Sequence, residues 1–423
     1  MNPTLKRLLI ILPGLLWIAS PAQDLEYGKP EELGFSTQRL ERIDQAFNSY
    51  VTENKMAGSV VLVVRKGKVA YYKAFGFRDK ESSSKMEVGN IFRIASQTKS
   101  IVSVGIMILQ EEGRLLLQDP VSRFIPEYKE TTVAVPKPTG GYDIVKAKRE
   151  MTIRDLLTHT AGVGYGQGIA ADEWKKAGLQ DFYFAHFNEP VAETIKRMAA
   201  LPMDAHPGER HVYGYATDIL GVVIERASGM PLDQFLKERI FDPLGMTDTY
   251  FFLPKEKASR LATVYMPKEG EPLKPAPVQG TVNSQGGYVT GPRKSFSGGA
   301  GLVSTAKDYY LFLQMLANGG ELHGKRILSP RTVHLMTIDH MEKNMEFRAG
   351  LGFGLGFEVV LDEGKRGTYG SPGQFGWGGA YGSTFWVDPA EELIVLYFTQ
   401  VRPGSIVKDQ LQLRALVYQA LVD

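Results

Sequence analysis

The chain has 423 residues, enough for one large or two modest domains, and its 49 Lys and Arg side chains nearly balance its 47 Asp and Glu side chains. A net charge this close to neutral gives no reason to expect nucleic acid or an anionic membrane surface as a partner. The chain has no cysteine, which excludes disulfide bonds and a lipid-modified cysteine anchor.

The first residues have the pattern of a secretory signal peptide. Lys6 and Arg7 supply positive charge, residues 8–18 form an apolar stretch too short to span a membrane, and residues 20–22 are small enough for cleavage. We therefore predict a signal peptide over residues 1–22 and export to the periplasm or the exterior. Loss of Lys6 and Arg7 brings the net charge from +2 to zero. An uncleaved anchor is the alternative, which the proline and glycine inside the stretch disfavour.

The next part of the chain predicts a helix followed by a hairpin. Ser36 can cap a helix that keeps an apolar face as far as Val51. Residues 58–65 and 68–75 have the composition of two strands, and the Lys-Gly pair between them predicts a tight turn. Helical patterns then dominate as far as about Leu253. They include residues 152–157, 191–198, 216–228 and 232–240.

A long segment at residues 262–300 is rich in glycine and proline, which indicates a loop that forms a lid or a wall of a site. After it, residues 305–318 predict a helix. Strands are expected at residues 382–387 and 393–399, and a closing helix from about 406 to 421. Strands from both ends of the chain can form one antiparallel sheet with helices packed on it.

The order of these elements predicts an α/β (α+β) fold with a helical subdomain inserted in the middle. We expect the mature chain to be residues 23–423. Within it, the α/β part covers about 23–92 and 298–423, and the mainly helical part covers about 93–297.

Ser96-Gln97-Thr98-Lys99 opens an apolar helical run, and this placement is the strongest indication of chemistry. Residues three apart share one helix face, so the Ser96 hydroxyl and the Lys99 amine should lie side by side. A serine at the start of a buried helix gains from free backbone N–H groups and the positive end of the helix dipole. The amine can take the serine proton if burial lowers the pKa of the amine. The same spacing occurs elsewhere, but only Ser96 introduces a long buried helix.

Two further segments can contribute to such a site. Tyr213 precedes an apolar helix and could act as base or acid toward Ser96 if Lys99 stabilises its phenolate, although a packing role is the alternative. Residues 376–380 read Gly-Trp-Gly-Gly-Ala before a predicted strand. A backbone N–H there could stabilise an oxyanion, and a plain glycine-rich turn is the alternative.

Longer motifs accompany these residues. They are Leu156-Leu157-Thr158-His159-Thr160-Ala161-Gly162, Leu220-Gly221 with Ser228-Gly229, Pro243-Leu244-Gly245-Met246, and Gly301-Leu302-Val303-Ser304-Thr305. With them, nearly all of the mature chain resembles the serine β-lactamase-like family, which holds class C β-lactamases, D-alanyl-D-alanine carboxypeptidases and family VIII carboxylesterases. The resemblance implies a β-lactamase/penicillin-binding-protein-like fold. It also implies Ser96 as nucleophile, Lys99 as its partner, Tyr213 as third catalytic residue, and the N–H groups of Ser96 and Ala380 as oxyanion hole.

Two departures from the β-lactamase pattern bear on the substrate. The third position of the family's Y-x-N is Tyr215 here, and the place of its K-T-G is held by Trp377-Gly378-Gly379. The missing lysine would attract a carboxylate, and the missing asparagine is an amide donor and acceptor. A tryptophan offers an apolar wall instead. These forms resemble the family VIII esterases and imply neutral, apolar acyl esters more than anionic antibiotics.

We therefore expect an exported serine hydrolase that cleaves small-molecule carboxylic esters with short acyl chains. The alternatives are a β-lactamase or D-alanyl-D-alanine carboxypeptidase, an acyltransferase, and a binding or sensor module that is acylated once. No cofactor, metal or nucleic-acid partner is expected, and no stable membrane anchor after signal removal. His159 is interpreted as structural, and the oligomeric state is open.

Overall fold

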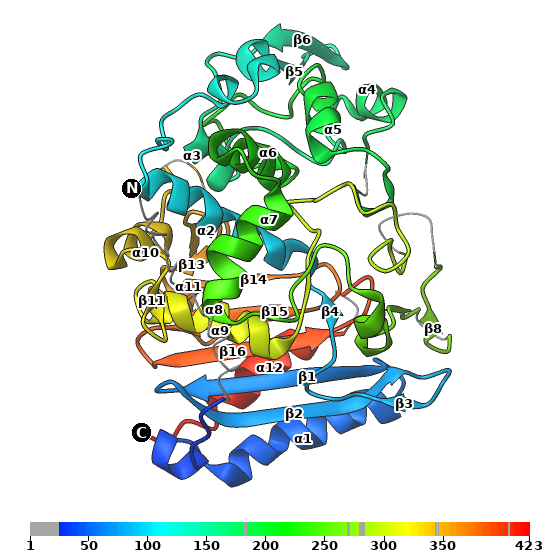
Figure 1. The fold of residues 1–423 in the computed structure, drawn as a ribbon, viewed down its shortest axis with the longest axis vertical. Helices are drawn as coiled ribbons and strands as arrows, with labels where there is room; N and C mark the ends of the chain where they lie inside the picture. The colour runs from blue at the N-terminus through cyan, green and yellow to red at the C-terminus, as the bar shows by residue number, and fades with distance from the viewer. Residues whose placement is uncertain are drawn as a thin grey trace, which may run out of the picture.

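The computed structural model describes residues 25–180, 184–268, 271–278, 284–342, 345, 347–404 and 407–423. The predicted signal peptide at residues 1–22 therefore lies outside the described residues. The architecture is layered, with an antiparallel sheet between a pair of helices on one face and a larger helical region on the other (Figure 1).

The main sheet has eight strands and joins both ends of the chain. In spatial order they are β12 (Leu351–Phe353), β13 (Glu358–Val360), β14 (Phe375–Gly378), β15 (Thr384–Asp388), β16 (Leu393–Thr399), β1 (Gly58–Arg65), β2 (Lys68–Asp79) and β3 (Ser84–Lys85). Every neighbouring pair is antiparallel. At the centre, β1 pairs with β16, so that Val61 lies opposite Tyr397. The predicted single antiparallel sheet is thus confirmed.

In the described part of the chain, four two-stranded ribbons lie outside this sheet. They pair β4 (Phe92–Arg93) with β9 (Val303–Ser304), β5 (Thr132–Pro136) with β6 (Tyr142–Lys146), β7 (Tyr265–Met266) with β8 (Lys274–Pro275), and β10 (Glu321–Leu322) with β11 (Lys325–Arg326). The β5–β6 ribbon lies in a region for which mainly helical patterns were predicted. The sequence did not reveal it, because β6 is mostly exposed and neither short strand shows a clear apolar alternation.

The α-helices of the described residues supply the rest of the framework. They are α1 (Thr37–Thr52), α2 (Thr98–Glu111), α3 (Ile153–Leu157), α4 (Ala171–Lys176), α5 (Val191–Met198), α6 (Ala216–Ser228), α7 (Leu232–Leu236), α8 (Asp242–Leu244), α9 (Ala306–Ala317), α10 (Pro330–Met336), α11 (Glu363–Arg366) and α12 (Asp409–Tyr418). Residue 406, where the closing helix was predicted to begin, lies outside the described residues. None of the described helices combines the length and apolarity needed to cross a bilayer.

Local signals account for the predicted helix and hairpin near the N-terminal end of the described chain. Ser36 Oγ accepts a hydrogen bond from the Arg39 N–H and so caps α1. Lys66 and Gly67 have φ angles of 52° and 73°, which is the left-handed backbone that a two-residue hairpin turn requires. Both predictions are confirmed.

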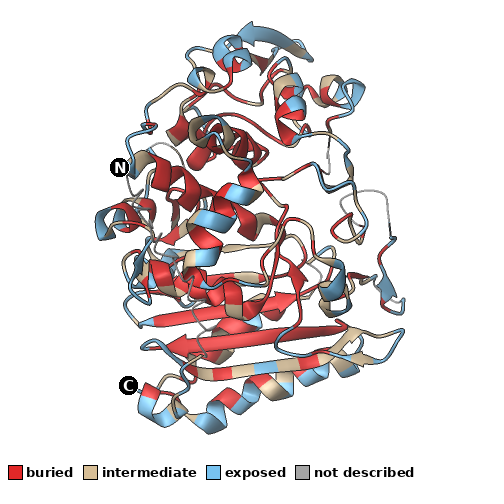
Figure 2. Ribbon diagram, in the orientation of Figure 1, coloured by how far each residue is buried: buried red, intermediate tan, exposed pale blue. Residues whose placement is uncertain are grey.

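The central strand β1 is buried along its whole length because both faces of the sheet are covered (Figure 2). Val61 and Val63 point to one face, where they pack with α1 and α12. Val60 and Leu62 point to the other face and join the large core of the helical region. This explains why β1 reads as a continuous apolar run and not as an alternating one.

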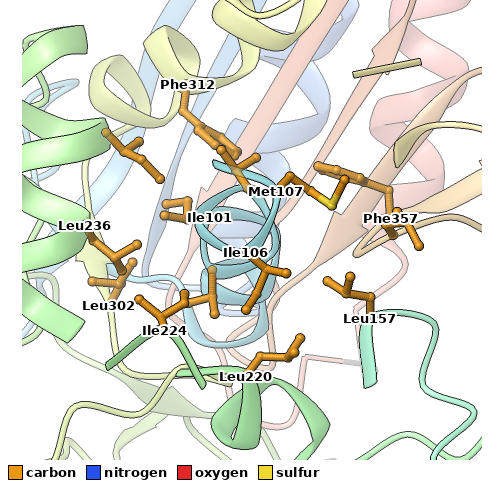
Figure 3. Packing of buried hydrophobic residues seen from close by; sticks show 14 of the residues in the cluster. Ile101, Ile106, Met107, Leu157, Leu220, Ile224, Leu236, Leu302, Phe312 and Phe357 are labelled. Atoms are coloured by element: carbon orange, nitrogen blue, oxygen red, sulfur yellow. The ribbon is translucent and has the colours of Figure 1, made fainter. Parts of the chain in front are cut away.

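Helix α2 lies at the centre of the large core, as Figure 3 shows. Its residues from Thr98 to Leu109 are all buried. Side chains from α3, α6, α7 and α9 surround it, so its position is fixed from several sides. The surrounding residues drawn in the figure include Leu157, Leu220, Ile224, Leu236 and Phe312. This packing makes α2 a rigid base for the residues at its N-terminal end.

Candidate active site

Ser96 lies in a short 3-10 turn, Ala95–Gln97, that leads directly into α2. A hydrogen bond fixes this turn, because Tyr309 Oη donates to the Gln97 carbonyl at 2.8 Å. Ala95 has a φ angle of +43°, a left-handed conformation that residues other than glycine seldom adopt. Backbone strain of this kind clusters at functional sites. Ser96 is half-buried and lines a cavity of about 570 Å³.

Lys99 lies one turn further along α2, and only 2% of its surface is exposed. Its Nζ donates hydrogen bonds to Ser96 Oγ at 3.3 Å, to Tyr165 Oη at 3.2 Å and to the Gly299 carbonyl at 2.7 Å. An ammonium group has three N–H donors. The three acceptors therefore satisfy the charged form of Lys99, and the predicted side-by-side placement of Ser96 and Lys99 is observed.

The charge state of Lys99 differs from the expectation. Burial by itself lowers the pKa of a lysine, but Tyr165, Tyr213 and Asp218 favour the ammonium form, and together they raise the pKa of Lys99 above its usual value. The condition under which Lys99 would take the serine proton, a pKa lowered by burial, is therefore not met in this structure. Lys99 instead places a fixed positive charge beside Ser96.

Tyr213 lies on the other side of this charge. Its ring centroid is 4.8 Å from Lys99 Nζ. The neighbouring Val212 N–H donates to the His159 carbonyl at 2.7 Å, and the His159 ring packs against the Tyr213 ring with centroids 4.8 Å apart. The Leu-Leu-Thr-His-Thr-Ala-Gly motif thus positions Tyr213. Trp377 Nε1 donates to Tyr213 Oη at 3.3 Å.

Trp377 is therefore more than the apolar wall that the sequence indicated. It lies on β14, and its ring meets the Tyr213 ring with centroids 5.5 Å apart. Its N–H supplies a hydrogen-bond donor to the Tyr213 oxygen. Since Lys99 and Trp377 both face Tyr213, negative charge that develops on this oxygen is stabilised from two sides.

The end of β14 lies close to the Ser96 turn because of one glycine. A Cβ atom at Gly379 would lie 2.6 Å from the Ile94 carbonyl oxygen, so only glycine allows this approach. Ser96, Trp377, Gly378 and Ala380 all border the cavity that also includes Tyr213. Across the described part of the chain, the backbone N–H groups of Ser96 and Ala380 donate to no protein acceptor. They are therefore free to bind an oxyanion.

Tyr165 was missed by the sequence reasoning. It follows the Leu-Leu-Thr-His-Thr-Ala-Gly motif, is partly buried, and its hydroxyl accepts a hydrogen bond from Lys99. Burial raises the pKa of Tyr165, so its hydroxyl stays protonated at neutral pH. Among 19 tyrosines no local pattern distinguished it.

Asp218 was also missed, although it closes the segment that begins at Tyr213. It is buried in the first turn of α6, where its Oδ1 accepts hydrogen bonds from Ser297 Oγ at 2.6 Å and from the Gly299 N–H at 3.0 Å. The Gly299 carbonyl in turn accepts from Lys99. Burial raises the pKa of Asp218. The glycine-rich segment at residues 262–300 is thus, at Gly299, a wall of the site.

His159 packs and does not coordinate. Its ring contacts the rings of Tyr213, His211 and Phe353. Burial, with the Lys99 charge nearby, holds the pKa of His159 well below its usual value, so the ring is neutral. Among the described residues no group of three His, Cys, Asp or Glu side chains is arranged to hold a metal ion.

Comparison with known proteins identifies the family of the chain. Residues 43–419 match the family model described as Beta-lactamase. The chain is 35% identical over 360 residues to Protein Rv1367c of Mycobacterium tuberculosis (strain ATCC 25618 / H37Rv), covering 82% of this chain and 86% of that protein. It is 32% identical over 375 residues to Esterase EstB of Burkholderia gladioli, covering 85% of this chain and 89% of that protein.

A solved structure, EstCE1, described as a hydrolase with promiscuous acyltransferase activity, matches with a TM-score of 0.75 and 28% identity, covering 90% of this chain and 99% of that chain. Sequence and structure thus lead to one group of proteins. The chain belongs to the serine β-lactamase-like family and is a serine hydrolase.

Proposed function

We propose that this protein is an exported carboxylesterase that hydrolyses esters with short acyl chains through an acyl-enzyme on Ser96. The observation that carries the proposal is the position of Trp377. Its indole N–H donates to Tyr213 Oη at the place where β-lactam-cleaving relatives carry the lysine of K-T-G. The site beside Ser96 therefore has an apolar ring in place of a cation that would bind a carboxylate.

The proposed reaction uses the groups around Lys99. Tyr213, as phenolate, takes the Ser96 proton while Ser96 Oγ attacks the ester carbonyl carbon, and Lys99 and Trp377 stabilise the phenolate. The N–H groups of Ser96 and Ala380 bind the oxyanion. The C–O bond to the alcohol then breaks, and Tyr213 gives its proton to the leaving oxygen. In the second half, water gives a proton to the same phenolate and its oxygen bonds to the acyl carbon. The bond from that carbon to Ser96 Oγ then breaks, Tyr213 returns the proton to Oγ, and the acid leaves.

The first test counts product against enzyme. The mature protein is mixed with p-nitrophenyl butyrate, and nitrophenol is followed over many equivalents, with Ser96→Ala beside it. We expect continuous turnover that Ser96→Ala abolishes. One equivalent of product followed by no further release would contradict the proposal and favour an acylated sensor. Faster cleavage of a β-lactam or a D-alanyl-D-alanine peptide than of the ester would favour those activities.

Lys99→Ala and Tyr213→Phe test the assigned roles. Each should lower kcat by roughly 10²–10⁴-fold, the range for groups that move a proton or stabilise its acceptor. The measurement is kcat on p-nitrophenyl butyrate, with circular dichroism to confirm folding. Near wild-type kcat in either variant would remove that residue from the mechanism.

Transfer of the acyl group to an alcohol is a second candidate function. It is supported by the similarity to EstCE1, which is described as a hydrolase with promiscuous acyltransferase activity. The acyl-enzyme would then be attacked by an alcohol in place of water. Measuring the released acid against newly formed ester, in the presence of a primary alcohol, separates the two functions.

A further inference from the structure

The cavity that begins at Ser96 and Tyr213 extends away from them to a group of arginines. Its lining includes Arg348, Arg366 from the end of α11, and Arg414 from α12. None of these residues belongs to the catalytic group described above. Charged side chains in the same cavity as the nucleophile help to determine which substrates bind there.

Arg414 is buried, with 8% of its surface exposed. Its guanidinium lies 4.2 Å from the centroid of the Trp386 ring. Arg414 Nη1 donates to the Tyr369 carbonyl at 3.1 Å and to Gln374 Oε1 at 2.9 Å. A guanidinium has five N–H donors. Within the described residues, Nη2 and Nε of Arg414 donate to no group.

Arg366 is in a similar position, with 11% of its side chain exposed. Its contacts are long, at 3.5 Å both to the Tyr369 carbonyl and to Glu358 Oε1. Burial lowers the pKa of Arg414 to about 10, and the like charge of Arg366 adds to this effect. Two buried guanidinium groups close enough to repel each other are costly unless an anion lies between or beside them.

The carboxylates nearby do not balance this charge. Glu358 lines the cavity and is shared, because Arg348 Nη1 donates to it at 3.1 Å and Arg366 at 3.5 Å. Asp388 is not among the residues that line the cavity. Its Oδ2 already accepts hydrogen bonds from Tyr418 Oη at 2.6 Å and from the Ser371 N–H. Among the described residues, three guanidinium groups thus face two carboxylates here, which leaves a positive charge in excess in this part of the cavity.

The distance to the reacting centre follows from the strand that lines the cavity. Arg414 contacts Gln374, and Glu358 pairs with Gly376, so the arginines lie beside residues 374–376. Ala380, whose N–H faces the scissile carbonyl in the proposed mechanism, is four to six residues further on. Within this separation β14 alone, Phe375–Gly378, spans roughly 10 Å at the rise of an extended strand, and Gly379 and Ala380 follow beyond its end.

We propose that Arg366 and Arg414, with Arg348 at the rim, form an anion-binding subsite for a carboxylate or phosphate group remote from the scissile ester. This inference rests on the proposed ester hydrolysis for its substrate. The anion is either the far end of the ester itself or a free anion that occupies the cavity beside it. The apolar surface at Trp377 then contacts the part of the substrate near the reacting carbonyl, and the arginines bind its remote end.

The first experiment measures selectivity with length-matched pairs of esters. On the acyl side, the p-nitrophenyl monoester of sebacic acid is compared with p-nitrophenyl decanoate. On the alcohol side, the butyrate ester of ω-hydroxydecanoic acid is compared with n-decyl butyrate by acid release. In one of these series the wild type should prefer the anionic ester in kcat/KM by about tenfold or more, the effect of charge-assisted hydrogen bonds.

Arg414→Gln and Arg366→Gln should each lose this preference, while Arg331→Gln, an exposed arginine on α10 outside the cavity, should keep it. If Arg414→Gln fails to fold because of its contact with Trp386, Arg366→Gln carries the test. Melting temperatures identify a misfolded variant. Two results would overturn the subsite and leave the proposed esterase intact. One is turnover of the neutral esters with no preference for the anionic ester in either series. The other is a preference that survives in both arginine variants.

The second experiment needs no turnover. Calorimetry measures the binding of inorganic phosphate and of free sebacate to wild type, Arg366→Gln and Arg331→Gln. Arginine-dependent binding of phosphate assigns the subsite to a free anion, and arginine-dependent binding of sebacate alone, or of the anionic ester alone, assigns it to the substrate. Absence of both binding and ester preference overturns the proposal. If no ester is cleaved at all, arginine-dependent anion binding still supports the subsite while the proposed function fails.

Discussion

At the scale of single residues, the site depends on a chain of contacts that ends at Lys99. Asp218 accepts from the Gly299 N–H, the Gly299 carbonyl accepts from Lys99, and Lys99 donates to Ser96. Asp218 touches neither the nucleophile nor the cavity lining. We therefore interpret it as a positioning residue that holds the Gly299 carbonyl in place and adds negative charge behind the ammonium.

Asp218→Asn should lower kcat by about 10-fold or more and leave KM nearly unchanged, since the loss concerns the transition state and not substrate binding. The amide keeps the shape and an acceptor but not the charge. The measurement is kcat and KM on p-nitrophenyl butyrate across pH, because weaker support of the Lys99 ammonium should also move the pH profile. An unchanged kcat and pH profile would show that Asp218 only packs.

Gly379 gives a sharper steric test. Its replacement by alanine puts a Cβ 2.6 Å from the Ile94 carbonyl oxygen, so the end of β14 must move away from Ser96. We expect kcat to fall by about 10²-fold, the cost of misplacing a reacting group by about 1 Å. At Gly89 a Cβ meets nothing closer than 3.8 Å, so Gly89→Ala is the matched control. Equal activity of the two variants would refute the role of this approach.

At the scale of elements, the sequence predicted what depends on local pattern. Helix α1 with its serine cap, the β1–β2 hairpin, α5, α6 and the strand β16 all lie where periodicity and turn residues indicated. The nucleophile and the lysine were found because they share a face of one helix. Tyr213 and the segment of Ala380 were candidates from their local sequence, but packing and a plain turn remained alternatives, and their specific roles came from the resemblance.

Elements that depend on distant contacts were missed. The strands β12 and β13 have three residues each, too few to show a period. They are defined by pairing alone, because β13 pairs with β14 and β12 pairs with β13. Asp218 and Tyr165 were missed for the same reason. Their importance comes from Gly299 and Lys99, which the fold brings to them and which no spacing in the sequence reveals.

The packing around α2 leads to a prediction about this element. Ile106 is fully buried among residues of α3, α6 and neighbouring segments. Ile106→Ala should destabilise the protein by about 2–5 kcal/mol, the usual cost of such a cavity. Leu116, 56% exposed, is the control, and Leu116→Ala should change stability by less than about 0.5 kcal/mol. Denaturant titration measures both, and similar values would show that the α2 environment relaxes freely.

At the scale of the whole molecule, pH acts through carboxyl groups that the fold buries. Asp409, at the start of α12, accepts a hydrogen bond from Tyr397 Oη on the central strand β16. Burial raises the pKa of Asp409 to about 6. The folded protein therefore holds a proton that the unfolded chain releases at lower pH. The stability that this proton contributes is complete below pH about 4 and is lost as pH rises toward about 6.

Asp409→Asn removes this titration. Relative to wild type, the variant should gain about 2–3 kcal/mol in unfolding free energy between pH 4 and pH 7, which is the free energy of a shift of about two pKa units. Denaturant unfolding at several pH values measures the difference. A constant difference between variant and wild type over that range would show that Asp409 titrates normally in the folded protein.

The pairing of β1 with β16 has a consequence for the order of folding. The two strands at the middle of the sheet come from opposite ends of the described chain, with Ser59 opposite Thr399. During synthesis the first hairpin emerges early but must wait for nearly all of the remaining chain before its apolar edge is covered. Long-range pairing of this kind is slow and leaves strand edges exposed to aggregation. A nascent chain that stops before β16 would therefore carry an open, largely apolar edge along β1, a surface of the kind that chaperones bind.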